Sequence, residues 1–156
     1  MRLSARGQEA LKESEGLRLQ VYTCPAGFQT IGWGHKLTVS ERCSGKIVLP
    51  GVVIRYAQGI TEHQAQGILE WDILEAEQEV DDLVNVSLTQ GQYDVLVDFV
   101  FNFGAQALGT STLLDLLNQG RYDEVPDQLR RWVHADGKVV EGLVARRDRE
   151  VEAWLT

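Results

Sequence analysis

Apolar residues recur along the chain with two different spacings. Over residues 17–22 they alternate with polar residues, which is the period of a half-buried strand. Residues 28–31, Phe-Gln-Thr-Ile, are expected to form the returning strand, and the Cys-Pro-Ala-Gly run at 24–27 is typical of a turn. From residue 61 onward the apolar positions recur every three or four residues, as in helices that bury one face. The chain therefore predicts a small β-hairpin region followed by a larger helical region.

Capping residues mark the helix boundaries. Ser4 suits an N-cap, and Gly16 suits the position just after a last helical turn. The runs Thr61-Glu62-His63-Gln64 and Thr89-Gln90-Gly91-Gln92 both match a capping box. The predicted helices cover residues 4–14, residues 61–84, about 89–103, about 110–117, a segment that begins near Asp123 and carries Leu129 and Trp132, and residues 141–154.

Residues 36–60 have the weakest pattern. Residues 40–45, Ser-Glu-Arg-Cys-Ser-Gly, are polar and end in glycine, so we expect a loop there. Residues 46–49 are largely apolar, which favours a third strand that ends at Pro50-Gly51. The expected fold class is α+β, with a small three-stranded lobe and a larger helical lobe.

The charge balance restricts the partners that the protein can bind. Lysine and arginine total 15 and aspartate and glutamate total 23, so the formal net charge is −8. Such a chain lacks the basic stripe that binding to nucleic acid requires. No apolar run approaches the roughly 18 residues of a membrane span, and residues 1–9 lack the apolar core of a signal peptide. We expect a protein without stable membrane insertion that is made and stored in a reducing cytoplasm.

Two cysteines, Cys24 and Cys43, are too few for a disulfide scaffold. Neither has a histidine beside it that would indicate a metal site. We expect both thiols to stay reduced, and we expect neither a metal nor another cofactor.

Residues 15–35 gather most of the reactive side chains. Glu15 ends the first predicted helix, where the negative end of the helix dipole favours the protonated form of a carboxyl group and so suits a general acid. The hairpin that follows adds a thiol, a hydroxyl and an imidazole, and the two glycines around Trp33 let the backbone approach a ligand. Glu15 is equally compatible with a solvated surface glutamate, like Glu9 and Glu13 of the same helix.

This segment resembles the active-site segment of the phage-type lysozymes, glycoside hydrolase family 24. The family pattern reads approximately E-G-x-R-x-x-x-Y-x-D-x-x-G-x-x-T-I-G-x-G-H. The residues in register with it are Glu15, Gly16, Arg18, Tyr22, Gly27, Thr30, Ile31, Gly32, Gly34 and His35. One catalytic position differs, because Cys24 stands where the family has aspartate.

Three later segments also resemble the family, in the expected order. Asp72 matches a buried acid on the helix that joins the two lobes, and residues 101–104, Phe-Asn-Phe-Gly, resemble the F-N-x-G segment of the cleft floor. Asn102 is equally compatible with merely ending its helix before Gly104. Residues 142–147, Gly-Leu-Val-Ala-Arg-Arg, resemble G-L-x-x-R-R, in which one arginine of the family lies over the cleft near the catalytic acid.

The resemblance implies one lysozyme-like domain over residues 1–156. A small lobe with the hairpin covers about residues 15–60, and a linking helix covers residues 61–84. A helical lobe covers residues 85–156 together with the N-terminal helix at 4–14.

The same resemblance implies a substrate and a setting. The substrate is the glycan strand of bacterial peptidoglycan, hydrolysed at the β-1,4 bond between N-acetylmuramic acid and N-acetylglucosamine. The setting is a phage or prophage endolysin, expected to be a monomer that waits in the host cytoplasm for a holin-type protein and acts in the periplasm or cell wall. Two alternatives stay open: a catalytically weakened glycan-binding protein, and an antibacterial toxin or tail-associated lysozyme.

Under this interpretation the site residues have distinct roles. Glu15 is the general acid that protonates the leaving oxygen, and Thr30 holds the attacking water by its hydroxyl. Cys24 is the third catalytic residue, and an ionised carboxylate nearby is expected to raise the pKa of its thiol. A charge-assisted hydrogen bond between His35 and Asp72 is expected to join the small lobe to the linking helix. The expected substrate-binding residues are Gly32, Gly34, Phe101, Asn102, Arg146 and Arg147.

Overall fold

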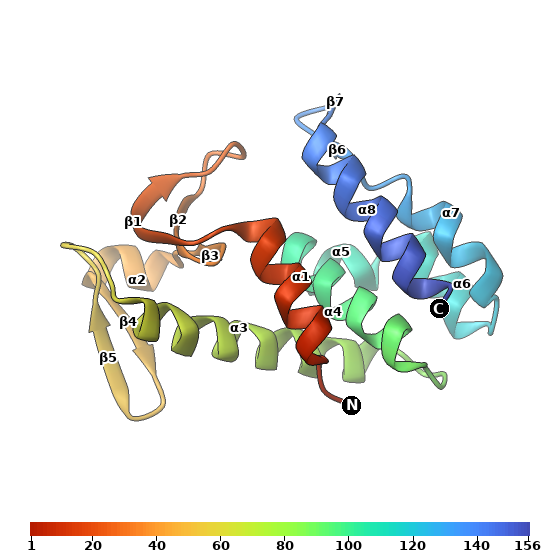
Figure 1. Ribbon diagram of the computed structural model, residues 1–156, viewed down its shortest axis with the longest axis horizontal. Coiled ribbons are helices and arrows are strands. Elements are labelled where there is room, and N and C mark those ends of the chain that lie inside the picture. Colours follow the sequence, from red (N-terminus) through yellow and green to blue (C-terminus); the bar gives the residue numbers. More distant parts are fainter. The chain divides into compact units, whose positions relative to one another are not determined.

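The computed structural model describes residues 1–156 (Figure 1). The chain forms two compact units. We call residues 10–74 the hairpin unit, and residues 1–9 with 75–156 the helical unit. Two helices, α1 (Ala5–Glu15) and α3 (Glu62–Leu83), each contribute residues to both units. None of the helices combines the length and the apolar composition that crossing a bilayer requires.

Helix α1 begins and ends where the sequence predicts. The Ser4 hydroxyl accepts a hydrogen bond from the backbone N–H of Gly7 (3.0 Å), which satisfies one of the free amides at the helix start. Gly16 follows the last residue with a φ of 68°, a conformation that glycine adopts without steric cost. This ending fixes Glu15 at the C-terminal end of the helix.

A three-stranded antiparallel sheet forms next, from β1 (Arg18–Thr23), β2 (Gln29–Gly32) and β3 (His35–Lys36). Its β1–β2 turn is closed by hydrogen bonds from Cys24 N to Phe28 O (2.9 Å) and from Gly27 N to Cys24 O (2.8 Å). The predicted hairpin is therefore confirmed, but its third strand is not the one predicted.

Residues 46–49 form β4 (Lys46–Leu49), which pairs only with β5 (Val52–Arg55) in a separate two-stranded sheet. Pro50 and Gly51 are the two-residue turn between these strands, and Gly51 has a φ of 75°. Because a two-residue turn brings β5 directly back onto β4, this local pairing forms without the long connection that joining the first sheet would need. The expectation that residues 46–49 extend the first sheet was wrong.

The loop expected at residues 40–45 was also wrong, because a helix, α2 (Val39–Ser44), occupies this segment. Thr38 and Glu41 form a capping box at its start, and Gly45 ends it with a φ of 71°. The Thr-x-x-Glu signal is visible in the sequence, but the short polar segment has no apolar face that would reveal a helix.

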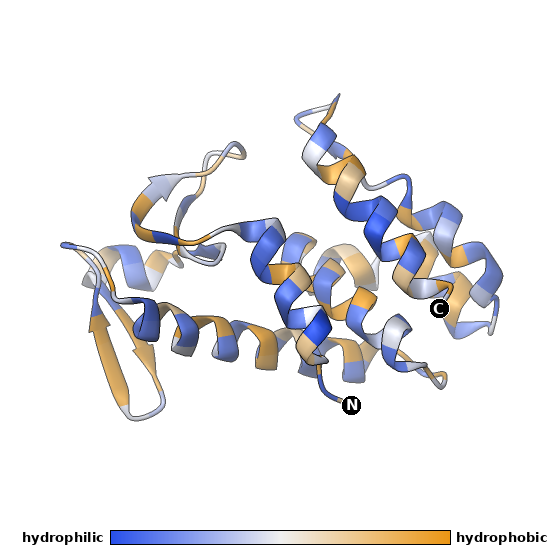
Figure 2. Cartoon of the chain, viewed as in Figure 1, coloured by the Kyte–Doolittle hydropathy of each residue, from blue (hydrophilic) through white to orange (hydrophobic).

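Helix α3 confirms the helix that the first capping box predicts. Thr61 accepts from the backbone of Gln64 (3.1 Å), and the Gln64 side chain accepts from the backbone of Thr61 (3.0 Å). Apolar positions (orange) alternate with polar ones (blue) along the helix (Figure 2). The buried apolar side chains of α3 are Ala65, Ile68, Leu69, Ile73, Ala76 and Val80.

The helical unit has its core around α4. The elements that follow α3 are α4 (Gln90–Phe103), α5 (Ala105–Gly109), α6 (Thr112–Asn118), a 3-10 turn η1 (Tyr122–Glu124), α7 (Val125–Leu129), β6 (His134–Ala135), β7 (Lys138–Val139) and α8 (Glu141–Trp154). Helix α4 is buried on several sides, as its nearly continuous apolar sequence predicts. Three predicted helices, α4, α6 and α8, are confirmed, whereas α5 and the β6–β7 hairpin were missed. Helix α7 stops at Leu129, so Trp132 lies beyond the helix expected to carry it.

Candidate active site

Glu15 lies against the backbone of Gly34 in the hairpin unit. A Cβ atom added to Gly34 would overlap the Glu15 carboxylate, and the φ of 74° at Gly34 also favours glycine. Gly32 has a φ of 67° and faces Ala65 and Ile60, where an added Cβ would meet only ordinary contacts. Gly34 therefore makes room for the acid, whereas Gly32 serves the turn of the chain.

Thr30 occupies the middle of the three-stranded sheet and is only 2% exposed. Its hydroxyl donates a hydrogen bond to the carbonyl of Phe28 (3.0 Å) and also lies within hydrogen-bonding reach of the Cys24 thiol. A hydroxyl has one proton but two lone pairs, so Thr30 can donate either to the Phe28 carbonyl or to a Cys24 thiolate, and in both cases it can still accept a hydrogen bond. That free acceptor capacity is what holding a water molecule requires.

The surroundings of Cys24 favour its ionised form. Burial alone raises the pKa of the thiol, but hydrogen bonds from the backbone amides of Phe28 and Ala26 and from the Thr30 hydroxyl, together with the charge of Lys36, lower the pKa below its ordinary value. The expectation of a raised pKa was therefore wrong. The sequence alone does not show that Lys36 and these amides lie beside the thiol.

Tyr22 lies close enough to both Glu15 and Cys24 for their charges to affect the pKa of its hydroxyl. The pKa of Tyr22 is raised, first by burial and then by the nearby charges of Glu15 and Cys24, against a smaller opposing effect of Arg18. Tyr22 pairs with Thr30 across β1 and β2, and Thr30 pairs with Lys36 across β2 and β3. Tyr, Thr and Lys thus form one row across the sheet.

His35 is bound by two carboxylates. Its Nδ1 lies 2.8 Å from Asp72 Oδ2, which is the hydrogen bond that the sequence predicts, and its Nε2 lies 2.9 Å from Glu41 Oε2. Burial lowers the pKa of the imidazole, but the two carboxylates outweigh burial and raise it to about 9. His35 is therefore a cation at neutral pH, and this cluster ties β3, α2 and α3 together.

The predicted substrate-binding residues on α4 and α8 belong to the helical unit. Phe101 and Asn102 are half-buried on α4. Arg146 donates two hydrogen bonds to Asp98, from Nε to Oδ2 (2.9 Å) and from Nη2 to Oδ1 (2.8 Å). Although burial raises the pKa of Asp98, the arginine lowers it further, so the pair is ionic.

Arg147 is completely buried within the helical unit. Its Nη2 donates to Glu150 Oε1 (2.5 Å) and to Asn102 Oδ1 (3.3 Å), and its guanidinium lies 5.5 Å and 4.9 Å from the ring centroids of Phe99 and Phe103. Burial raises the pKa of Glu150 far above its ordinary value, even though Arg147 opposes this. These contacts give Arg147 a structural role between α4 and α8.

Comparison with known proteins places the chain in a family. The family described as Phage lysozyme matches residues 12–150. The chain belongs to this family of phage lysozymes. It is 35% identical to the endolysin of Salmonella phage P22 over 156 residues, which cover all of this chain and 99% of that protein. It is also 35% identical to the endolysin of Bacillus phage B103, but it spans only 55% of the length of that protein.

A solved structure agrees with the fold of this phage lysozyme. The muramidase domain of SpmX from Asticaccaulis excentricus is 33% identical and superimposes with a TM-score of 0.80 over 99% of this chain and 98% of that domain. The predicted fold class, an α+β lysozyme fold with small sheets and a helical lobe, is thus confirmed.

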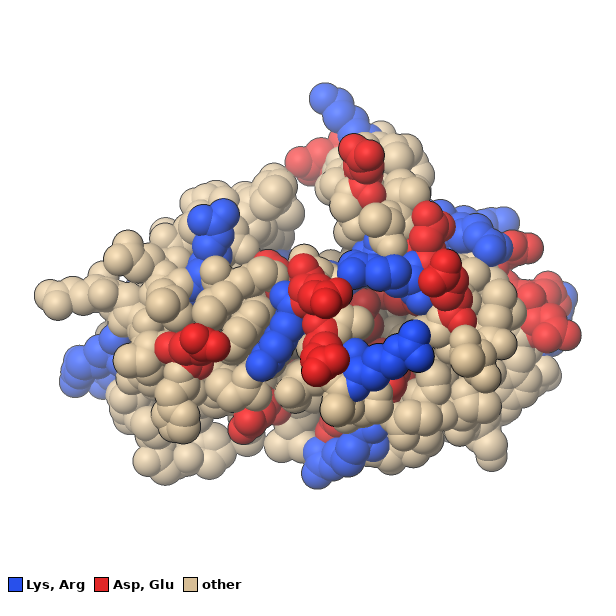
Figure 3. All heavy atoms as spheres, in the orientation of Figure 1, with Lys and Arg blue, Asp and Glu red and all other residues tan.

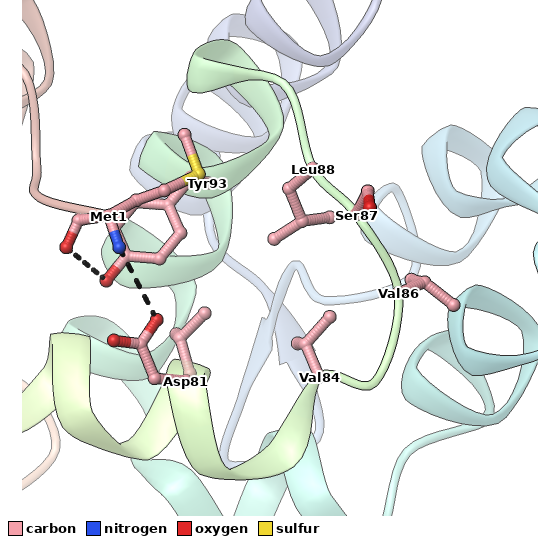
Figure 4. A pocket seen from close by; sticks show the side chains of 8 residues that line it. Met1, Asp81, Val84, Val86, Ser87, Leu88 and Tyr93 are labelled. Carbon is pink, nitrogen blue, oxygen red and sulfur yellow. Dashed lines mark hydrogen bonds and ion pairs between the residues drawn. The ribbon is translucent and has the colours of Figure 1, made fainter.

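A separate cavity of about 310 Å³ lies in the helical unit of this phage lysozyme, near the end of α3 and the start of α4 (Figure 4). Its walls are about equally polar and apolar, with Val84, Val86 and Leu88 from the connecting segment facing Asp81, Ser87 and Tyr93. The Tyr93 hydroxyl donates to the carbonyl of Met1 (3.3 Å) at its edge. The cavity contains no paired acid and nucleophile, so it is not a second catalytic centre.

Both cysteines are free thiols, and no cluster of three or more His, Cys, Asp or Glu residues is arranged to hold a metal ion. Sequence reasoning gave no role in the site or its support to five residues, Tyr22, Lys36, Glu41, Asp98 and Glu150, although Tyr22 is in register with the family pattern. The strand register could have identified Tyr22 and Lys36 as site residues, because both pair with Thr30.

Proposed function

We propose that this protein is a peptidoglycan muramidase that hydrolyses the β-1,4 bond between N-acetylmuramic acid and N-acetylglucosamine. The observation that carries the proposal is the grouping of an acid, a thiol and a buried hydroxyl around Tyr22, within a segment that matches the family's active-site pattern. Glycoside hydrolysis needs one group that protonates the leaving oxygen and a second that handles the attacking water or the developing cation.

Glu15 supplies the proton. It protonates the glycosidic oxygen as the bond to the anomeric carbon breaks, and it is left as a carboxylate. A water molecule held by the Thr30 hydroxyl attacks the anomeric carbon from the opposite face, which inverts its configuration. The proton that this water loses passes to the Cys24 thiolate, whose lowered pKa makes it available as an acceptor.

Cys24 therefore supports the reaction while Thr30 positions the water. A thiolate also places negative charge near the oxocarbenium-like transition state, as the family's aspartate is expected to do. Because a thiol ordinarily ionises at a higher pH than a carboxyl group, this contribution is expected to be smaller than that of a carboxylate.

The remaining predicted residues have two kinds of role in the proposal. Gly34 is assigned to glycan binding in the hairpin unit. Phe101, Asn102 and Arg146 are assigned to glycan binding in the helical unit, with Asp98 holding the Arg146 guanidinium in one orientation. Arg147 is assigned to support, because it is buried and its Nη2 bonds Asn102 of α4 and Glu150 of α8.

The setting that we propose is a phage or prophage endolysin. The chain is 35% identical to two phage endolysins and covers nearly all of one of them. We infer a monomer that accumulates in the host cytoplasm, is released by a separate holin-type protein and then acts in the periplasm or cell wall. A toxin or tail-associated lysozyme would share the chemistry and differ only in this setting.

Mass spectrometry of purified peptidoglycan after digestion tests the proposed reaction. The expected products are muropeptides with a reducing N-acetylmuramic acid end, which borohydride reduces. Anhydro-muramic ends would instead indicate a transglycosylase that uses no water. If sacculi bind the protein but release no fragments, while the protein is folded, the chain is the glycan-binding alternative.

A further inference from the structure

Charge is distributed very unevenly along this chain. Residues 16–61 contain five basic residues and a single acid, Glu41, which gives this segment a formal charge of +4 within a chain of −8. The Glu41 carboxylate is itself bound to His35. On the face drawn in Figure 3, acidic side chains (red) lie mainly over the helices. The strand-bearing part of the hairpin unit is therefore locally cationic in an acidic protein.

The β4–β5 hairpin has two distinct faces. Ile47 pairs with Ile54, and both are almost fully buried, as is Leu49 at the next inward position. These three side chains anchor the hairpin to the rest of the hairpin unit, where Leu49 contacts Gly67 of α3. Because side chains alternate along a strand, the other face points away from this anchor.

The outer face is apolar near the turn and basic at the opposite end. Val48 and Val53, the pair of this face nearest the turn, are 68% and 53% exposed. Lys46 and Arg55 form the next pair on the same face, at the end away from the turn. Figure 2 shows the hairpin as largely orange, and the apolar side chains of its outer face are exposed.

The two basic side chains lack a partner of opposite charge. Neither Lys46 nor Arg55 forms an ion pair, although they lie directly opposite each other. Like charges in directly opposed positions destabilise a β-ribbon, and an anion bound between them removes that repulsion. The hairpin thus offers exposed valines at its tip and an unsatisfied cationic pair behind them.

We propose that the outer face of the β4–β5 hairpin docks on the surface of an anionic phospholipid bilayer. Val48 and Val53 enter the boundary between headgroups and acyl chains, and Lys46 and Arg55 bind lipid phosphates. This combination of apolar tip and basic collar is the one that interfacial membrane binders use. The face has no aromatic or amide side chain, which a hydrated glycan strand would require for stacking and hydrogen bonds.

The attachment is peripheral and weak. Each strand of four residues is about 13 Å long at roughly 3.3 Å per residue, far less than the roughly 30 Å of a bilayer core. With only two cations, binding depends on the anionic lipid content and is weakened by salt. Because the rest of the chain is acidic, an anionic bilayer does not attract the whole protein over a long range. The protein therefore contacts the bilayer through this hairpin.

Flotation with large unilamellar vesicles tests the proposal on the full chain. One set of vesicles contains phosphatidylglycerol and phosphatidylethanolamine, and the other contains only phosphatidylcholine. The charge variant is Lys46→Gln with Arg55→Gln, which removes both positive charges. The valine variant is Val48→Thr with Val53→Thr, which keeps the branched shape but replaces one methyl of each side chain with a hydroxyl. A control variant, Lys138→Gln with Val139→Thr, makes one change of each kind on the exposed β6–β7 hairpin.

Wild type and the control are expected to bind the anionic vesicles and not the phosphatidylcholine vesicles, with binding lost in high salt. The charge variant should bind about 30-fold more weakly, since each cation near an anionic surface contributes about fivefold. The valine variant should bind several-fold more weakly. Equal binding by all four proteins, or none by wild type, overturns the proposal. Loss of peptidoglycan binding by the charge variant, with normal vesicle binding, would identify an anionic wall polymer as the occupant instead.

Two further measurements separate this proposal from the enzymatic one. Both hairpin variants should melt with wild-type cooperativity, because their side chains point away from the anchor, and should digest purified sacculi normally. A catalytically inactive Glu15→Gln protein should still bind vesicles as wild type does.

Discussion

Glu41 binds the ring nitrogen of His35 that Asp72 leaves available. Its Oε2 lies 2.9 Å from His35 Nε2, and the same oxygen accepts the backbone N–H of Thr38 (2.9 Å) at the start of α2. Burial opposes a charged imidazole, yet the two carboxylates raise the pKa of His35 to about 9. One carboxylate therefore caps a helix and also holds a buried cation.

This arrangement predicts a stability that falls at alkaline pH. The pKa of His35 rises from 6.5 to about 9 on folding, so its contribution is complete below pH 6.5 and is lost as the pH climbs through about 9. At about 1.4 kcal/mol per pKa unit, it is worth about 3 kcal/mol. Asp72→Asn removes one of the two carboxylates, so it should lower the free energy of unfolding by a part of that amount at pH 6 and by much less at pH 10. Urea unfolding across this range measures the difference from wild type.

Glu41→Gln separates the cap from the ion pair. Glutamine can still accept from Thr38 in a capping box, so α2 should keep its start while His35 loses one charge partner. Glu79→Gln, at an exposed position of α3, serves as the control and should have little effect. A loss from Asp72→Asn that is the same at pH 6 and pH 10 would show that the imidazole charge does not contribute.

The Asp98–Arg146 pair predicts a large effect of removing one charge. Its side chains are 14% and 7% exposed, whereas the otherwise similar Asp127–Arg130 pair is 81% and 52% exposed. Asp98→Asn removes the carboxylate that forms two hydrogen bonds with the buried Arg146 guanidinium and should cost about 3–5 kcal/mol. Asp127→Asn should cost less than about 1 kcal/mol. Chemical denaturation of both variants at neutral pH is the measurement, and equal small losses would contradict a buried ionic pair.

The helices that could be predicted are those with both a cap and an apolar stripe. Thr61 and Thr89 begin α3 and α4 as their capping boxes indicate, because each box is followed by a long apolar pattern. Thr38 begins α2 with the same kind of box, but that helix buries no residue and so leaves no apolar signal. A capping box was therefore not sufficient to predict a helix without an apolar pattern after it.

The site was predictable as far as its residues lie close together in sequence. Glu15, Cys24 and Thr30 fall within one segment, so a motif could gather them. Lys36 reaches Cys24 only because β3 pairs with β2, a register that a two-residue strand does not reveal. The Asp98–Arg146 pair joins residues 48 positions apart and depends on how α4 and α8 pack.

Glu15 provides the most direct test of catalysis. Glu15→Gln keeps the shape of the side chain but removes the proton that the leaving oxygen needs, so lysis of purified sacculi should fall by orders of magnitude. Glu9→Gln makes the same change at an exposed position of α1 and should leave activity unchanged. Circular dichroism should show that both variants are folded. A folded Glu15→Gln protein with near wild-type activity would remove Glu15 from the mechanism.

Cys24 and Thr30 should differ in their importance. Thr30→Ala removes the hydroxyl that holds water and should cost more activity than Cys24→Ala, whereas Thr30→Ser should recover much of the loss. Proton NMR of the first product formed should show inversion at the anomeric carbon. Abolition of activity by Cys24→Ala in a folded protein, together with retention of configuration, would instead identify the thiolate as a covalent nucleophile.

The pH dependence of Cys24→Asp shows whether ionisation at this position matters. The hydrogen bonds and the Lys36 charge lower the pKa of the Cys24 thiol, yet a thiol still loses its charge at a higher pH than a carboxyl group does. As the pH falls, the wild-type enzyme loses the thiolate while an aspartate stays ionised. The ratio of Cys24→Asp activity to wild-type activity should therefore be largest at acid pH and decrease as the pH rises. Lys36→Gln in the wild-type background should raise the thiol pKa and shift the acid limb of its activity profile to higher pH. The same substitution should move the profile much less when Cys24 is alanine, because no thiol is then left to ionise. A ratio that stays constant with pH would mean that the thiol takes no charged role in the reaction.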